Sequence, residues 1–321
     1  MEYIRQLSYN VGSYFYNSFS SHNFHPLKPF DITHPVFIFG LSYTHDTPSE
    51  LSFADAAHRI HDLITITYRQ KYATLGHTYL TSDAGWGCAI RSVQMLLVNS
   101  IVVYLDKSFH PEYTSHDHIA IKNNAKQLVF DKESSVLSIH NIYIQDAIIK
   151  HNPTGTNFLP PSTCATAVAD LYNFWEKRTF DVLMCTEYIP EVTQPTLLFI
   201  PRIVTKSERN FIQTTSFLPQ SRGFVAGIGD AAIYCFGVQE KRVFFLDPHF
   251  VQDASEVGYF NRPIFEANFD ELDNSFVFGM MCENKSDCEV VRMTFNMGKE
   301  KVIAREMNST ENIKGFEVLN F

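Results

Sequence analysis

The sequence has 321 residues, of which 45% are hydrophobic and 19% are charged, and its formal net charge at pH 7 is −9. This length and apolar content predict one large globular domain. The negative charge argues against a nucleic-acid-binding surface, and the lack of any run of about 18 apolar residues argues against a membrane span.

The six cysteines are scattered, at positions 88, 164, 185, 235, 282 and 288, and no pair has Cys-x-x-Cys spacing. This spacing argues against a disulfide framework and against a cysteine zinc site. The N-terminus lacks the basic and then apolar order of a secretory signal. We therefore expect a reducing, cytoplasmic location and no metal or other cofactor.

The first half of the chain is predicted to be mainly helical after one short strand. Residues 1–30 show no clear period and are expected to form an N-terminal arm. Residues 35–40 are predicted to be a buried strand, and the apolar spacing in residues 50–68 predicts a helix. Residues 107–138 are polar with little period, which indicates a variable, insertion-like segment.

Further helices are predicted over residues 139–150 and over residues 163–175, the second capped by Ser162. The strand candidates that follow are residues 196–201, 224–228, 233–238, 242–246 and 275–282. Because the helices come first and the strands later, we expect an α+β domain in which an antiparallel sheet packs against helices.

Two groups of histidines are candidate metal ligands. His58 and His61 are three residues apart on a predicted helix, and His116 and His118 flank Asp117 in a polar stretch. Neither group has a clear further ligand near it in the sequence, so surface or capping histidines are the simpler interpretation.

Residues 81–95 combine a glycine-flanked turn with the start of a helix, and Cys88 lies at the junction. The apolar residues after it have helical spacing: Ile90, Val93, Leu97, Ile101 and Tyr104. A thiol in the first turn of a helix has a lowered pKa, because unpaired N–H groups and the helix dipole favour the thiolate. Gly85 and Gly87 allow a sharp turn, and Trp86 offers an apolar wall. A small buried cysteine is the alternative.

The segment of residues 241–249 ends a predicted strand with an acid and a histidine. Asp247 and His249 are two residues apart, so both project to the same side of an extended backbone, and Pro248 stiffens the connection. The imidazole can take the thiol proton while the carboxylate orients the ring. An ordinary Asp-Pro-His turn is the alternative.

Together these motifs resemble the active-site signature of the autophagins, the autophagy-related cysteine endopeptidases, which have a papain-like fold. The resemblance runs from about Val36 to Cys282 and rests on residues 81–88, Arg91, Gln94-Met95, Tyr68-Arg69, residues 218–221, Tyr234, Gly237 and residues 246–249. It implies a protease domain over residues 31–305.

The resemblance implies a role for each matching residue. Cys88 is the nucleophile, His249 is the general base and acid, and Asp247 orients His249. Tyr68 helps to form the oxyanion hole together with the backbone N–H of the cysteine. From the residues alone, a core aromatic on a helix face is the better interpretation of Tyr68.

The implied substrate is a ubiquitin-like autophagy modifier, cut after a glycine near its C-terminus and released from phosphatidylethanolamine. Trp86 and Gly87 would line a narrow slot for the glycine-ended tail. The two gating positions depart from the family pattern, with Phe158 in place of a tryptophan and Gly227 to Gly229 in place of a glycine-proline loop. We expect a monomer that contacts membranes only transiently, through its lipidated substrate, and binds no nucleic acid.

Residues 306–321 are expected to form a C-terminal tail. Phe316 and Leu319 have the aromatic-x-x-aliphatic spacing that docks as an added strand on such modifiers. A disordered tail is the alternative.

Two other functions stay open at this point. The altered gating residues fit a catalytically weak protein that only binds the modifier. A papain-fold deubiquitinase or acyltransferase would use the same cysteine and histidine, and the C-terminal tail that is accepted would distinguish it.

Overall fold

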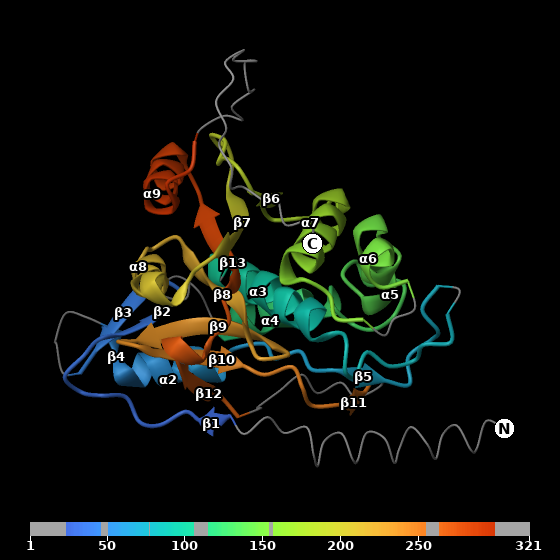
Figure 1. The fold of residues 1–321 in the computed structure, drawn as a ribbon, viewed down its shortest axis with the longest axis horizontal. Coiled ribbons are helices and arrows are strands. Elements are labelled where there is room, and N and C mark those ends of the chain that lie inside the picture. Colours follow the sequence, from blue (N-terminus) through green and yellow to red (C-terminus); the bar gives the residue numbers. More distant parts are fainter. Residues whose placement is uncertain are drawn as a thin grey trace, which may run out of the picture.

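The computed structural model describes residues 24–45, 51–76, 78–105, 115–153, 157–254 and 263–298. These residues form one large mixed sheet, with helices packed on both faces, and a separate two-stranded parallel sheet (Figure 1). The strands are β1 (His25–Pro26), β2 (Val36–Ile38), β3 (Leu41–Thr44), β4 (Leu51–Ser52), β5 (Arg69–Gln70), β6 (Asp181–Met184), β7 (Thr196–Ile203), β8 (Ser221–Ile228), β9 (Ala231–Gln239), β10 (Arg242–Leu246), β11 (Gln252–Asp253), β12 (Phe265–Asn268) and β13 (Ser275–Cys282). The helices are α2 (Phe53–His61), α3 (Cys88–Leu105), α4 (Ser115–Gln127), α5 (Ile139–Tyr143), α6 (Asp146–His151), α7 (Pro161–Phe174), α8 (Asn210–Ser216) and α9 (Lys285–Phe295), with short 3-10 turns at Lys206–Glu208 and Phe269–Glu271.

The main sheet follows the order β1-β12-β10-β9-β8-β13-β7-β6, and β2 pairs with β9 outside this path. All neighbours along the path are antiparallel except β6 and β7, which are parallel. The expected α+β class with an antiparallel sheet is therefore confirmed. All five strand candidates of the second half are present, as β7, β8, β9, β10 and β13, whereas β6, β11 and β12 were not expected.

Two hydrophobic cores lie on opposite faces of the sheet. Helices α3 and α7 contribute to one core, and α8 and α9 contribute to the other. In β7, Leu197 and Phe199 belong to the first core, and Leu198 and Ile200 belong to the second, as the alternation of a strand requires. Figure 1 shows α8 and α9 well apart from α5, α6 and α7 across the sheet.

Helix α3 is the central helix of the first core. By length and composition it could cross a membrane, but 83% of this stretch is buried inside the protein, as in the core helix of a globular domain. It packs against β8 and β9 and reaches β13, where a Cβ atom on Gly279 would lie 2.7 Å from Cδ1 of Leu96. The close approach at Gly279 holds the helix, and with it Cys88, against the sheet.

The helix predicted over residues 50–68 is shorter in the structure, because α2 ends at His61. Ser52 and Asp55 form a capping box at its start. Beyond its end, the side chain of Asn99 on α3 accepts a hydrogen bond from Ile64 N–H (2.9 Å) and donates one to Ile64 O (3.0 Å). These tertiary bonds take the place of helical ones, so residues 62–68 are not helical and Tyr68 does not lie on a helix.

The polar segment of residues 107–138, which is expected to be variable and insertion-like, contains α4, a helix that its weak period did not predict. The side chains of Ala125 and Leu128 are buried at its C-terminal end. The helix predicted over residues 139–150 is divided into α5 and α6. Ser162 is not a helix cap, because α7 begins at Pro161, and a proline is well suited to that first position, where no N–H bond is needed.

The segment of residues 24–34 lies along the β12 edge of the sheet. Strand β1 pairs with β12, and Phe24 packs edge-on against Phe245 (5.0 Å between ring centroids). The Gln239 side chain accepts from Asp31 N–H and donates to the carbonyls of Asp31 and His34. The rest of the expected arm and the expected tail, residues 306–321 with Phe316 and Leu319, lie outside the described residues.

We predict that Leu96→Ala lowers the free energy of unfolding by about 2–5 kcal/mol, because it leaves a cavity between α3 and β13. The control is Met293→Ala on α9, whose side chain is 67% exposed and whose loss should cost about 0.5 kcal/mol or less. Urea unfolding followed by circular dichroism measures both. Equal effects of the two substitutions would contradict the packing of α3 against Gly279.

Candidate active site

Cys88 is the first residue of α3 and is 3% exposed. The turn before it is held by the carbonyl of Asp83, which accepts hydrogen bonds from the N–H groups of Trp86 (3.2 Å) and Gly87 (2.9 Å). The helix then continues with the bond from Arg91 N–H to Gly87 O (3.0 Å). The first N–H groups of a helix have no acceptor within it, so Cys88 lies where a negative charge is favoured.

His249 is held by Asp247, which directly follows β10. Oδ1 of Asp247 lies 2.6 Å from Nδ1 of His249 and also accepts the His249 backbone N–H at 3.0 Å. Both side chains are largely buried, with 3% of His249 and 15% of Asp247 exposed. The double contact fixes the ring and leaves Nε2 for the thiol.

Cys88 and His249 form a hydrogen-bonded pair. Burial works against ionisation of the thiol, but the hydrogen bond with His249 and its positive charge prevail, and the pKa of Cys88 is lowered. Burial likewise opposes the charge on His249, yet its bonds with Asp247 and Cys88 raise the pKa of His249 to about 9. Both shifts favour the charged forms of the pair, the Cys88 thiolate and the His249 imidazolium, over the neutral forms.

Tyr68 lies beside this pair, on the extended segment that leads into β5. Its backbone N–H donates to Pro248 O (2.9 Å), and its carbonyl accepts from Gln252 N–H (3.0 Å). The ring meets that of His249 edge-on, with 5.3 Å between the centroids. A hydrogen bond from the Tyr68 side chain to the Cys88 sulfur helps to lower the pKa of Cys88. The phenol hydroxyl is thus beside the atom that would attack a carbonyl.

Two residues of the site were not found from the sequence. The backbone of Ala232, in β9, forms a hydrogen bond with the Cys88 sulfur, and its carbonyl accepts from the Ser92 hydroxyl (3.1 Å). A backbone contact leaves no mark on the residue type, so no pattern could have revealed it. Asp83 was seen only as part of the motif, although the pairing of its charge with Arg91 was a usable signal.

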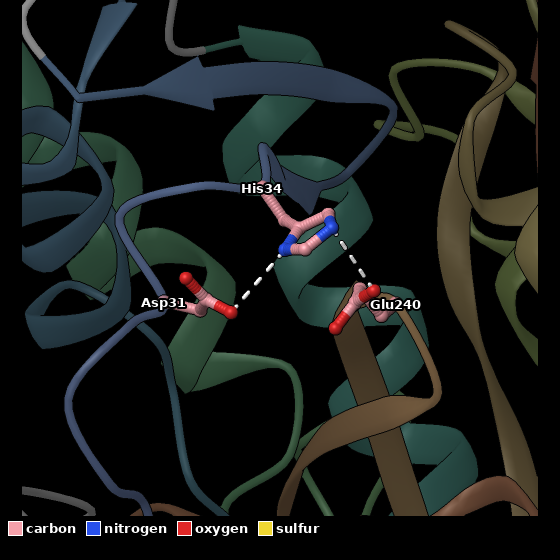
Figure 2. Close-up of side chains that lie close together, drawn as sticks. All are labelled: Asp31, His34 and Glu240. Atoms are coloured by element: carbon pink, nitrogen blue, oxygen red, sulfur yellow. Dashed lines mark hydrogen bonds and ion pairs between the residues drawn. The ribbon is translucent and has the colours of Figure 1, made fainter.

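The described part of the chain contains one group of side chains with metal-ligand geometry, and it is exposed and distant in sequence from Cys88: Asp31, His34 and Glu240. Figure 2 shows the His34 ring between the two carboxylates, with Nδ1 3.2 Å from Asp31 and Nε2 3.1 Å from Glu240. Because each ring nitrogen already faces a carboxylate, this is a surface ion-pair cluster. His118 of the other sequence candidates instead pairs with Asp62 (3.2 Å).

Comparison with known proteins places this geometry in a family. The chain matches the peptidase C54 catalytic domain over residues 53–293, which is most of its length and includes the residues of the pair. The chain belongs to the peptidase C54 family. This confirms the resemblance to the autophagins and the papain-like fold, and it places the chain in a family of cysteine proteases.

Its relatives among curated C54 peptidases are distant in sequence. Cysteine protease ATG4b of Arabidopsis thaliana is 27% identical over an alignment of 276 positions that covers 70% of this chain and 57% of the relative. Cysteine protease ATG4B of Gallus gallus is 24% identical over 315 positions, covering 79% of this chain and 78% of the relative. The probable cysteine protease ATG4 of Meyerozyma guilliermondii is 26% identical over 258 positions, covering 75% and 60%. The chain thus spans less than two thirds of the plant and yeast relatives.

The residues expected to bind the substrate of a C54 peptidase differ in exposure. Phe158 is 59% exposed shortly before α7, and Gly229 is an exposed residue of the β8–β9 turn with φ of +58°. Gly227 is tightly enclosed, since a Cβ atom there would lie 2.3 Å from Asp273. Trp86 is 3% exposed and its indole N–H donates to Ser82 O. Their roles toward substrate stay predictions.

We predict that iodoacetamide at pH 6 labels Cys88 faster than any other cysteine. Burial raises the pKa of Cys164, Cys185 and Cys235, whereas the pKa of Cys88 is lowered. His249→Ala removes the positive partner and should shift the labelling of Cys88 toward the ordinary thiol range near pH 8.5. Mass spectrometry of the labelled protein measures the rate at each site. His151→Ala, on α6, is the matched control, and an unchanged profile in His249→Ala would contradict the pair.

The pH dependence of hydrolysis should be bell-shaped. Activity is lost at low pH, where the thiolate is protonated, at a value below that of a free thiol because the pKa of Cys88 is lowered. Activity is lost again above about pH 9, where His249 gives up the proton that the leaving group needs. Both limbs of the pH profile report apparent pKa values of the coupled pair and not of either residue alone. Steady-state rates across pH measure them, and an alkaline limb near pH 6.5 would contradict the raised pKa of His249.

Proposed function

We propose that this chain is a cysteine endopeptidase that cleaves a ubiquitin-like autophagy modifier after its C-terminal glycine and releases the same modifier from phosphatidylethanolamine. The observation that carries the proposal is the buried pair of Cys88 and His249, with Asp247 behind the imidazole and Tyr68 beside the sulfur. Family membership supplies the class of protease.

The geometry supports a two-step reaction. The Cys88 thiolate attacks the glycine carbonyl, and the Tyr68 hydroxyl and the Cys88 backbone N–H receive the negative charge on oxygen. His249 gives its proton to the leaving nitrogen, the C–N bond breaks, and a thioester to Cys88 remains. Neutral His249 then takes a proton from water, which attacks the thioester and releases the glycine carboxylate.

The same steps serve both substrates, because each presents a glycine carbonyl bonded to an amide nitrogen. In the precursor this nitrogen belongs to the next residue, and in the lipid conjugate it belongs to ethanolamine. The proposal includes a monomeric protein that meets membranes through the conjugate and works in the cytoplasm. The free thiols of all six cysteines fit a reducing compartment.

The first test is cleavage of such a modifier extended beyond its terminal glycine. Cys88→Ala should abolish cleavage, His249→Ala should slow it by about 100-fold or more, and Tyr68→Phe by about 100-fold. Product masses show the cut site. A modifier that is bound by the wild-type protein but left whole would favour a binding protein, and faster cleavage of an extended ubiquitin would favour a deubiquitinase. Liposomes carrying the lipid conjugate test release from the membrane.

The second test concerns Phe158 as a lid over the substrate tail. Phe158→Ala should raise KM for the modifier severalfold with little change in kcat, since an exposed side chain contributes to binding and not to the chemistry. The matched control is Phe174→Ala, which removes a 90% exposed phenylalanine from the other end of α7. Equal KM values for the two variants would remove Phe158 from the substrate path.

A further inference from the structure

Asp83 connects the two parts of the site that must receive the negative charge of the reaction. Its side chain is fully buried. Oδ1 accepts the N–H of Arg69 (2.6 Å), the residue after Tyr68, and the Asp83 N–H donates to Arg69 O (3.2 Å). On the other side, its carbonyl accepts the N–H of Gly87, the residue before Cys88. One residue therefore links the neighbours of Tyr68 and Cys88.

The side chain of Asp83 is itself fixed from the helix. Oδ2 accepts Nε of Arg91 at 2.6 Å, and Arg91 also contacts Oδ1 of Asp131 (3.0 Å). Although burial alone would lower the pKa of Arg91, the charges of Asp131 and Asp83 raise it above its ordinary value, so Arg91 stays charged. Gly87 leaves room for this carboxylate, because a Cβ atom there would lie 2.6 Å from Oδ2 of Asp83.

Tyr68 has a second set of contacts, which tie it to His249 and not to Cys88. Its backbone bonds to Pro248 and Gln252 place it on the β5–β11 pair. The Thr67 hydroxyl adds a bond to the Gln252 side chain (2.8 Å). Without the Asp83 side chain, the segment that carries Tyr68 would keep its contacts with the histidine loop. Its link to the start of α3 would then rest on the Asp83 backbone and on Ser82, which bridges to Gln70 and whose hydroxyl donates to Arg69 O (3.0 Å), so the spacing between Tyr68 and Cys88 would be held less tightly.

We propose that Asp83 is a positioning residue for catalysis, which sets the Tyr68 hydroxyl against the Cys88 backbone N–H so that both donate to the same carbonyl oxygen. The proposal rests on the proposed cysteine-protease chemistry but not on the identity of the macromolecular substrate. Asp83 does not contact His249. It affects how well the oxyanion is stabilised, and it does not affect the ionisation of the Cys88 thiol.

The test uses the p-nitrophenyl ester of N-acetylglycine, a small substrate that acylates a thiol and releases nitrophenolate. Asp83→Asn keeps the size of the side chain, but its amide can satisfy only one of Arg69 N–H and Arg91 Nε–H. We expect acylation, per active site titrated by iodoacetamide, to fall about 10- to 100-fold. The pH profile of Cys88 alkylation should not change, because the pair with His249 is intact.

A double-mutant cycle with Tyr68→Phe separates positioning from a general structural role. In the Tyr68→Phe background, Asp83→Asn should lower acylation less than threefold, because the donor that it positions is already gone. Fully additive losses would overturn the inference, as would a shifted alkylation profile. The matched control is Asp287→Asn on α9, whose carboxylate likewise accepts two hydrogen bonds, from Gln220 Nε2 (2.7 Å) and Glu283 N–H (2.9 Å), and it should leave acylation per titrated site unchanged.

Gly87→Ala provides a second variant should Asp83→Asn fail to fold. It displaces the Asp83 carboxylate instead of removing it. We expect the same fall in acylation per titrated site, and the same smaller fall when Tyr68 is already replaced by phenylalanine. Wild-type protein that is acylated by the ester but leaves the modifier whole would refute the proposed substrate and not this inference. Wild-type protein that is alkylated at Cys88 but not acylated would overturn the inference.

Discussion

The active site depends on a charge cluster that is completely buried. Arg91 and its two carboxylates, Asp83 and Asp131, have no exposed side-chain surface. Burying ions is costly, and removing one member leaves an unpaired charge in the interior, so the three must stay together for the domain to fold well. Asp83 belongs to the turn before Cys88, and Arg91 belongs to the first turn of α3. The buried ion pair between them therefore stabilises the core and also fixes the loop that carries the nucleophile.

In the catalytic pair of Cys88 and His249, burial opposes the charges, and hydrogen bonds within the site compensate for it. Apolar surroundings alone would keep both Cys88 and His249 neutral. Their mutual hydrogen bond, together with Asp247, outweighs this, and the rise in the pKa of His249 from 6.5 to about 9 amounts to about 3 kcal/mol in favour of the charged ring. Burial also excludes water, which strengthens these interactions. Enclosure therefore acts in two directions: it opposes the charge on each residue, and it strengthens the hydrogen bonds that compensate for that cost.

Local patterns predicted α3 and five strands of the second half, β7, β8, β9, β10 and β13, because helical spacing of apolar residues or an apolar run marks each of them. The same patterns failed where tertiary bonds decide. Residues 62–68 have helical spacing, yet Asn99 from α3 takes the backbone groups of Ile64. In the site, the chemistry of Cys88, Asp247 and His249 could be inferred from residue types and spacing. The backbone of Ala232 and the linking role of Asp83 depend on how distant segments meet, which spacing along the chain does not encode.

The β8–β9 hairpin contacts the Cys88 sulfur through the backbone of Ala232 and is exposed to solvent at its tip. Its inner part is fixed, since the Ser92 hydroxyl holds Ala232 O and Asp273 N–H holds Gly227 O at 2.8 Å. Its tip is exposed, and a Cβ atom added at Gly229 would meet no atom within 4 Å. The contact between the Ala232 backbone and the Cys88 sulfur therefore does not depend on the side chains of the exposed tip. Substitution at Gly229 is compatible with an unchanged environment of Cys88, because no side chain there would reach the packed part of the hairpin.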